Sequence, residues 1–233
     1  IGTIMTNIAG TQHILDYAVK ANSEKVLFLS TVEIYGENRG DIDKFTEDYC
    51  GYIDCNTLRA GYPEGKRASE SLCQAYIQKY GIDVVIPRIS RTFGPTMLLS
   101  DSKASSQFIM NAVHKENIVL KSAGTQLYSY AYVADIVSAL LFLLVKGQKG
   151  EAYNVSNEHC DITLRTFAET LANVAGTKVI HGEATAQEKQ GFSKATKALL
   201  DNQKIYALGW RPLYDSMEEP LKHTIKILEG SGN

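Results

Sequence analysis

The sequence predicts an α/β fold built on a parallel sheet. A short apolar stretch, Val26 to Leu29, ends on the hydroxyls of Ser30 and Thr31, as a buried strand does at the edge of a sheet. A second stretch, Asp83 to Ile89, is apolar along nearly its whole length, which is typical of a strand covered on both faces. Between the two, residues 62–80 carry apolar side chains at helical spacing. A strand, a helix and a strand in this order favour parallel pairing.

The first third of the chain has clear helix signals. Residues 3–22 predict an amphipathic helix, with Leu15 and Val19 at helical spacing. Residues 37–61 are polar or glycine-containing and predict a loop that leads to the helix at 62–80. Pro63 suits the first turn of that helix and Gly81 suits a left-handed end. Pro87 is awkward in a central strand, so we expect it near the strand's end.

The rest of the chain predicts shorter elements. Asp201 is expected to cap the helix that follows it. Residues 185–191 are expected to be irregular. The expected helices are 101–114, 136–145, 163–175, 203–208 and 216–228, and the expected strands are 118–120, 128–132, 152–156 and 178–181.

Composition excludes several classes of protein. The 233 residues can form one sizeable domain, or a domain with a small lobe. A net charge of −2 gives no electrostatic case for binding nucleic acid or an anionic membrane. No apolar run is long enough to span a bilayer, and we expect no signal peptide. The four cysteines lack C-x-x-C spacing, so we expect reduced thiols, a cytoplasmic location and no metal site.

The motif Tyr62-x-x-x-Lys66 carries the chemistry. A tyrosine and a lysine four residues apart project from the same face of a helix. A phenol ionises at about pH 10, and a neighbouring cation lowers that pKa. Such a tyrosine can take a proton from a substrate hydroxyl near neutral pH. Ligands of parallel sheets lie at the carboxyl ends of strands, where Thr31 is expected. These residues therefore predict a site that oxidises an alcohol.

Several separated motifs resemble the extended short-chain dehydrogenases/reductases, in the branch of NAD-dependent nucleotide-sugar epimerases, dehydratases and decarboxylases. Decarboxylases of UDP-glucuronate are the most similar within it. The resemblance runs from about Asn7 to Pro212. It rests on Asn7-x-x-Gly10-Thr11, the stretch Ser30 to Gly36, Tyr62-x-x-x-Lys66, Arg88 to Pro95, Tyr132-Val133-Ala134-Asp135 and Gly209-Trp210-Arg211-Pro212.

The resemblance implies roles for individual residues and a nucleotide sugar, UDP-linked or carried by another nucleotide, as substrate. In the family the Tyr oxidises a sugar hydroxyl, at C4, and the Lys holds the nicotinamide ribose. The glycine of the Asn7-x-x-Gly10 motif allows close helix packing there, and the Asp of the Tyr132 to Asp135 motif caps the helix after it. The implied catalytic residues are Thr31, Glu33, Tyr62 and Lys66. The implied NAD-binding residues are Asn7, Ser30, Tyr62, Lys66, Ile89, Thr92 and Lys103, and the implied substrate-binding residues are Tyr76, Arg91, Gln107 and Tyr128.

The chain departs from the family at positions near the substrate. Val32 stands where dehydratases have Asp and decarboxylases have Ser, so the usual acid for eliminating water is missing. Arg91 replaces an Asn, while Thr96 and Tyr128 each replace an Arg. Arginine binds phosphate through two parallel hydrogen bonds, which threonine and tyrosine cannot do. We interpret these changes as a rebuilt substrate pocket.

A glycine-rich turn after a first strand is expected in this family but is not found. The only G-x-G lies at Gly230-Ser231-Gly232. From the resemblance we expect that roughly 80 to 110 residues at the N-terminus are missing, and with them most of the dinucleotide site. The expected fold is thus an N-terminally truncated Rossmann-type sheet with a small C-terminal α+β substrate lobe. Residues 1–95 would be the remainder of the NAD-binding domain. Residues 96–233 would form the lobe, with a strand and helix at about 130–157 returning to the sheet.

Alternatives remain open at this point. The helices at 3–22 and 62–80 would form a homodimer in the family, or bury their apolar stripes within one chain. An open edge on the strand at 26–29 would be covered by an oligomer or a partner. For function, the alternatives are an inactive or truncated remnant that folds and oligomerises without NAD, a regulator that senses a dinucleotide, and a UDP-glucuronate decarboxylase proper.

Overall fold

The computed structural model describes residues 1–98, 100–101, 103–185 and 195–230. The chain divides into two compact units, each with its own sheet. The first unit comprises Ile1–Ser90, Val137–Val155 and Leu200–Arg211. The second comprises Arg91–Ile136, Ser156–Leu199 and Pro212–Asn233.

The sheet of the first unit is parallel, as predicted. Its central strand is β3 (Val84–Ile89). Strands β1 (Val26–Leu27) and β2 (Ser30–Thr31) pair with one edge of β3, and β7 (Ala152–Val155) pairs with β3 as well. The predicted strand at 26–29 is therefore present as two short segments in line, both parallel to β3.

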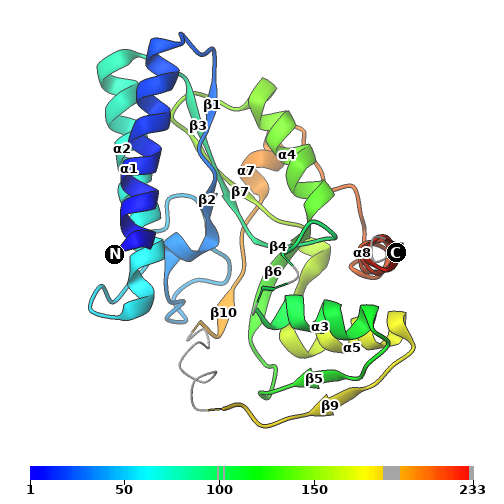
Figure 1. Cartoon of the computed structure of the whole chain (residues 1–233). Coiled ribbons are helices and arrows are strands. Elements are labelled where there is room, and N and C mark those ends of the chain that lie inside the picture. Colours follow the sequence, from blue (N-terminus) through cyan, green and yellow to red (C-terminus); the bar gives the residue numbers. More distant parts are fainter. Residues whose placement is uncertain (99, 102, 186–194, 231–233) are drawn as a thin grey trace. The chain divides into compact units, whose positions relative to one another are not determined.

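Two long helices cover one face of this sheet. Helices α1 (Gly2–Lys20) and α2 (Gly61–Tyr80) lie side by side, whereas α4 (Val133–Lys146) lies on the opposite face (Figure 1). Gly81 ends α2 with a φ of 74°, and its N–H donates to the Ile77 carbonyl, which confirms the predicted left-handed end.

Small residues on α2 allow α1 to come close. A Cβ at Gly65 would lie 3.1 Å from Cβ of Asn7, and Ser69 Oγ donates to the Asn7 carbonyl at 2.9 Å. The expected role of Gly10 in close helix packing is wrong, because a Cβ there would meet nothing within 4 Å. The close approach of the two helices depends instead on Gly65 and Ser69 of α2. A buried cluster joins the two helices to the sheet. It consists of Leu15 of α1, Cys73 and Tyr76 of α2, and Val84 and Ile86 of β3.

Pro87 lies inside β3, not near its end as we expected. The N–H of Ile86 donates to the Glu151 carbonyl on the β7 side. Because successive amides of a strand point to opposite edges, position 87 faces the other edge, where β1 has ended and β2 has not begun. The proline therefore occupies a place in this ladder where a missing N–H costs no strand–strand hydrogen bond.

The second edge of β1 is open in the described part of the chain. The N–H groups of Val26 and Phe28 donate to Asp83 and Val85 on the β3 side. The N–H groups of Leu27 and Leu29 therefore point away from β3, where no described strand pairs with them. Leu29 is also 41% exposed. An open edge of this kind was expected from the sequence.

The second unit is a mixed sheet with helices packed on it. Strand β6 pairs in parallel with β4 and β10 and antiparallel with β8. Two further strands, β5 and β9, pair in parallel. The elements are β4 (Arg91–Phe93), α3 (Ala104–Val113), β5 (Ile118–Leu120), β6 (Leu127–Tyr132), β8 (Asp161–Thr163), α5 (Leu164–Ala175), β9 (Val179–His181), β10 (Lys197–Ala198) and α8 (Glu218–Gly230).

The later helices were predicted close to their bounds. Helix α7 (Gln203–Ala207) follows Asp201, whose carboxylate accepts from the Gln203 N–H at 2.7 Å. Asp135 corrects the capping prediction: it lies within α4 and is fully buried. Its carboxylate accepts from the Leu213 N–H at 2.6 Å and from Asn157 Nδ2 at 3.0 Å. Asp135 thus anchors the segment at Leu213. Most of the irregular segment expected at 185–191 lies outside the described residues.

The short 3-10 helices were not predicted. They are η1 (Val32–Tyr35), η2 (Leu58–Ala60) and η3 (Glu158–Cys160). Among the described residues, no helix combines the length and apolar character needed to cross a bilayer. The same residues contain no cluster of metal-ligating side chains.

Candidate functional site

The structure brings Thr31 and Tyr62 together. Thr31 is the last residue of β2 and is 8% exposed, and Tyr62 lies in the first turn of α2 and is 37% exposed. The two side chains share a hydrogen bond that lowers the pKa of the Tyr62 phenol. The hydroxyl oxygen of Thr31 accepts from the Glu33 N–H at 3.3 Å. The end of a strand and the start of a helix thus meet at a pair of hydroxyls.

The pKa of Tyr62 moves in the direction opposite to our expectation. Burial raises it above its ordinary value, the hydrogen bond with Thr31 lowers it, and the negative charge of Glu33 raises it again. Lys66 is not among the groups that shift it, although the two residues are one turn apart. In the described chain Tyr62 is therefore protonated at neutral pH, and the lysine does not activate it directly.

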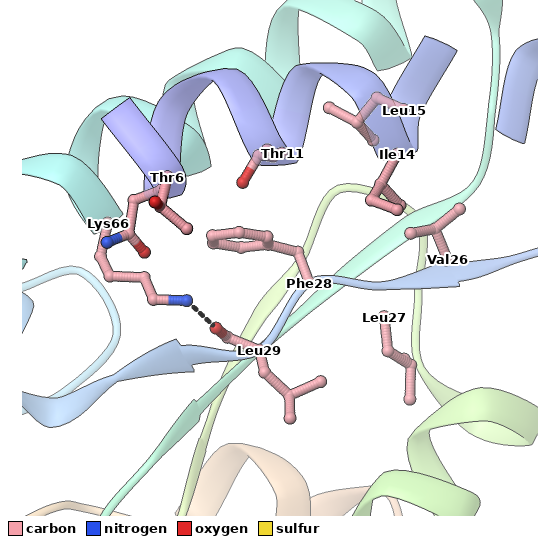
Figure 2. A pocket seen from close by; sticks show the side chains of 11 residues that line it. Thr6, Thr11, Ile14, Leu15, Val26, Leu27, Phe28, Leu29 and Lys66 are labelled. Carbon is pink, nitrogen blue, oxygen red and sulfur yellow. Dashed lines mark hydrogen bonds between the residues drawn. The ribbon is translucent and has the colours of Figure 1, made fainter. Parts of the chain in front are cut away.

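Lys66 is held by the end of the sheet. Its Nζ donates to the Leu29 carbonyl at 2.8 Å and lies 4.9 Å from the centroid of the Phe28 ring (Figure 2). Burial lowers the pKa of its ammonium. Sequence reasoning did not identify Phe28 or the Leu29 carbonyl, because backbone and ring contacts leave no pattern in the residue types.

A cavity of about 410 Å³ lies beside Lys66. Helix α1 forms one wall and the segment Val26–Leu29 forms another, with the Phe28 ring between them (Figure 2). Asn7 lines this cavity, and its Nδ2 donates to the Thr3 carbonyl at 2.8 Å. The lining residues are Thr6, Asn7, Gly10, Thr11, Ile14, Leu15, Val26, Leu27, Phe28, Leu29 and Lys66.

Part of this region suits the nicotinamide end of a dinucleotide. Ser30 is 2% exposed, and its Oγ has no hydrogen-bond partner among the described residues. A buried hydroxyl without a partner next to Thr31 and near an ammonium is suited to a polar ligand group. No described turn between a strand and a helix is glycine-rich, so we assign no residue to the diphosphate of such a cofactor.

Glu33 and Val32 face in different directions. Glu33 is exposed, and its negative charge raises the pKa of Tyr62. It therefore belongs with Thr31 and Tyr62 in the candidate site. Val32 is 5% exposed and packs in the interior. The departure at position 32 is therefore a core residue in this chain, and Glu33 supplies the carboxylate whose charge acts on the phenol.

Tyr76 does not belong to this group. It lies fourteen residues after Tyr62 on α2, roughly 21 Å further along the helix axis. Its ring packs in the buried cluster, and its hydroxyl donates to Asp16 Oδ1 at 2.5 Å. The expected substrate contact at Tyr76 is corrected to a core position that ties α2 to α1. Ile89, also expected near the cofactor, ends β3 beside Thr31 and Val155.

The other predicted residues belong to the second unit. The guanidinium of Arg91 lies over the ring of Tyr128, with Cζ 3.5 Å from the ring centroid. Thr92 is exposed in β4. Lys103 precedes α3 and pairs with Asp101 at 3.5 Å, and Nε2 of Gln107 donates to the Asp101 carbonyl at 2.8 Å.

A buried polar network of four side chains lies next to the candidate site, and the sequence did not predict it. Arg88 forms a two-point ion pair with Glu70, at 2.7 and 3.1 Å, and donates to the Tyr35 hydroxyl at 2.9 Å. The Tyr35 hydroxyl donates to Asn154 Oδ1 at 2.7 Å. Two signals were available: Glu70 follows Lys66 by one helical turn, and Arg88 is a charge within an apolar strand.

A parallel sheet that carries a Tyr–Lys helix and a threonine at its carboxyl end defines a protein of the short-chain dehydrogenase/reductase type. The chain belongs to the NAD dependent epimerase/dehydratase family, whose sequence profile matches residues 1–156. This confirms the resemblance that the motifs indicated.

Individual relatives agree with this assignment. UDP-glucuronic acid decarboxylase 1 of Xenopus tropicalis is 31% identical over 239 aligned positions, covering 100% of this chain and 54% of that protein. dTDP-D-glucose 4,6-dehydratase of Mus musculus is 28% identical, covering 94% and 60% respectively. The chain thus spans little more than half the length of these relatives.

Solved structures share the fold. UDP-glucose 4-epimerase of Thermotoga maritima, determined with UDP-glucose, aligns with a TM-score of 0.85 at 23% identity, over 99% of this chain and 71% of that chain. dTDP-glucose 4,6-dehydratase of Bacillus anthracis, determined with NAD, aligns with a TM-score of 0.80 at 23% identity, over 97% and 68%.

Proposed function

We propose that this chain carries the sugar-oxidising residues of an NAD-dependent nucleotide-sugar epimerase, dehydratase or decarboxylase. The observation that supports this most directly is the hydrogen bond between Thr31 and Tyr62 at the carboxyl end of the sheet, with the charge of Glu33 beside it. Family membership supports the same class.

The roles follow from the chemistry of each side chain. Tyr62 exchanges a proton with the reacting sugar hydroxyl, at C4, and Thr31 donates a hydrogen bond to the same oxygen. Lys66 holds the nicotinamide ribose, and Asn7, Ser30 and Ile89 contribute to the cofactor site of the first unit. When bound, NAD supplies the hydride acceptor and later returns the hydride. The protonated form of Tyr62 is the one that gives a proton back to the ketone oxygen in the return step.

Glu33 is the second acid/base. Once the sugar carries a ketone, the proton on the neighbouring carbon becomes acidic, and an exposed carboxylate beside Tyr62 is suited to remove it. The buried side chain of Val32 can neither give nor take a proton. Elimination of water needs that proton removed, so it depends on Glu33 and not on position 32. Loss of carbon dioxide instead breaks a carbon–carbon bond and leaves an enolate, to which Glu33 in its protonated form can give a proton. Arg91, Gln107 and Tyr128 contribute to the nucleotide-sugar site.

The proposal is tested in two stages. Calorimetric titration of the chain with NAD should show binding that Lys66→Ala weakens. Incubation with NAD and UDP-glucose, UDP-glucuronate or dTDP-glucose, followed by mass spectrometry, should show a changed sugar that Tyr62→Phe reduces by about 10²-fold or more. An unchanged rate in Tyr62→Phe would refute the assigned role of Tyr62.

Two other functions are supported by an observation, and a third, a regulator, is distinguished by the same experiments. A remnant that folds without NAD is favoured by the raised pKa of Tyr62, and it predicts neither binding nor turnover. A UDP-glucuronate decarboxylase proper is favoured by the 31% identity to the Xenopus tropicalis enzyme, and it predicts loss of carbon dioxide from UDP-glucuronate alone. A dinucleotide-sensing regulator predicts NAD binding without turnover and normal function in Tyr62→Phe.

A further inference from the structure

Arg88 is a charged side chain within the apolar central strand of the first unit. It is in register with Ser30 of β2, and its side chain is 12% exposed. The guanidinium donates to the Glu70 carboxylate at 2.7 and 3.1 Å, to the Tyr35 hydroxyl at 2.9 Å and to the Glu47 carbonyl at 2.7 Å. A buried ion pair seldom stabilises a fold more than apolar side chains of the same volume would. The benefit of Arg88 must therefore be sought in what it holds in place.

The first element that Arg88 holds is α2. Tyr62, Lys66 and Glu70 are four residues apart and therefore share one side of this helix. Lys66 Nζ donates to the Leu29 carbonyl at 2.8 Å, and one turn later Glu70 accepts from Arg88. The helix is thus attached to the sheet at two successive turns. Rotation or sliding of α2, which would displace Tyr62, breaks at least one of these contacts.

The second element that Arg88 holds is η1, through its last residue. The Tyr35 hydroxyl accepts from Arg88 and donates to Asn154 Oδ1 at 2.7 Å. Burial raises the pKa of Tyr35, so the hydroxyl keeps the proton that it donates. The Tyr35 ring is fully buried and stacks on Phe45 with 4.9 Å between centroids. Both the ring and the hydroxyl of Tyr35 are therefore fixed.

Holding both ends of η1 fixes Glu33 between them. At the first end, the hydroxyl oxygen of Thr31 accepts from the Glu33 N–H at 3.3 Å, and Tyr35 is the last residue of the turn. We propose that Arg88 and Tyr35 are positioning residues that hold η1 against α2. They thereby keep the carboxylate of Glu33 beside the phenol of Tyr62. The benefit of this arrangement for catalysis rests on the proposed function, whereas the arrangement itself does not.

The influence of Glu33 on Tyr62 measures this arrangement without NAD or substrate. Carbon-13 NMR of labelled tyrosine gives the pKa of Tyr62 with and without Glu33→Gln, in otherwise wild-type protein and in Tyr35→Phe. In the otherwise wild-type protein, Glu33→Gln should lower the pKa. In Tyr35→Phe the same change should have about half that effect or less, because the influence of a charge falls with distance.

Tyr153→Phe is the matched control. Tyr153 is 1% exposed in β7, and its hydroxyl accepts from the Gln148 N–H at 3.2 Å. The variant removes the same buried group as Tyr35→Phe, but from a hydrogen bond to the segment after α4. It should keep the full effect of Glu33→Gln. Melting temperatures identify unfolded variants, and if Tyr35→Phe is one, Arg88→Lys decides the test, because it loses the two-point contact with Glu70.

The outcomes separate positioning from a purely structural role. If Glu33→Gln has its full effect in the network variants, the proposal is overturned, even where their melting temperatures are lower. An equally reduced effect in Tyr153→Phe overturns it too, because it indicates a general loosening of the first unit. A lack of any effect of Glu33→Gln in the otherwise wild-type protein removes the relationship that Arg88 and Tyr35 would maintain, and also overturns it.

The outcomes also separate this inference from the proposed function. A reduced effect confined to the network variants, in a protein that turns over no nucleotide sugar, supports the positioning role and counts against the enzyme. In an active enzyme, Tyr35→Phe should lower kcat by about tenfold or more, because small displacements of reacting groups slow the chemical step. Its KM should change little, since Tyr35 is not a substrate contact. A raised KM with unchanged kcat would contradict the role.

Discussion

A hydrogen bond joins the side chains of Thr31 and Tyr62 and lowers the pKa of the phenol. The two residues are joined by the η1 segment and a long loop, yet β2 ends where α2 begins. Glu33, two residues after Thr31, adds a negative charge to the pair. Three influences thus set the pKa of Tyr62: its partial burial, the hydrogen bond with Thr31 and the charge of Glu33.

The first prediction concerns the pKa of Tyr62. Glu33→Gln removes a negative charge that opposes the phenolate, so the pKa should fall. Thr31→Val removes a hydrogen bond that stabilises the phenolate, so the pKa should rise. Carbon-13 NMR of labelled tyrosine, with the Tyr62 signal assigned through Tyr62→Phe, measures both changes. Glu24→Gln, at an exposed position after the end of α1, should leave the signal unchanged. Shifts of the same sign in both variants would contradict the arrangement.

The second prediction concerns the ion pair behind the site. Glu70 and Arg88 are 13% and 12% exposed, so Glu70→Ala leaves a buried guanidinium with one partner fewer. The free energy of unfolding should fall by about 3–5 kcal/mol in urea denaturation. On the same helix, Glu64 pairs with Arg67 at 3.7 Å in a more exposed setting. Glu64→Ala should cost less than about 1 kcal/mol. Equal losses in the two variants would refute the structural role of Glu70.

The sequence predicted the meeting of Thr31 and Tyr62 because parallel strands end at one edge and the following helix starts there. It could not predict that Tyr76 faces the core, since helical spacing identifies a stripe of residues but not its neighbour. Nor could it place Pro87, whose tolerance depends on the gap between β1 and β2. The stacking of Arg91 on Tyr128 depends on the register of β4 against β6, which residue types do not determine.

The third prediction concerns a backbone contact that supports η1. A Cβ at Gly51 would lie 1.5 Å from the Tyr35 carbonyl oxygen, so the chain after η1 must move in Gly51→Ala. We expect the free energy of unfolding to fall by more than about 3 kcal/mol. Gly10→Ala is the control, because its Cβ would meet nothing within 4 Å and alanine favours a helix interior by about 0.5–1 kcal/mol. A stable Gly51→Ala would mean that the loop is not packed against Tyr35.

The last prediction concerns the exposed face of α1. Tyr17 is 69% exposed and Ile14 is 61% exposed, three residues apart on one side of the helix. Apolar side chains in a contiguous exposed patch favour association. We therefore expect a homodimer through α1 and α2 at micromolar concentration in sedimentation equilibrium. Tyr17→Glu should raise its dissociation constant by at least about tenfold, since a carboxylate would be buried without a partner.

The face of the sheet that carries α4 supplies the control for this experiment. Leu141 is 61% exposed on that helix, which lies across the sheet from α1 (Figure 1). Leu141→Glu should leave the dimer intact if α1 and α2 form the interface. Dissociation in Leu141→Glu but not in Tyr17→Glu would move the interface to α4. A wild-type protein that stays monomeric would mean that the open edge of β1 and the apolar face of α1 need no second copy of the chain.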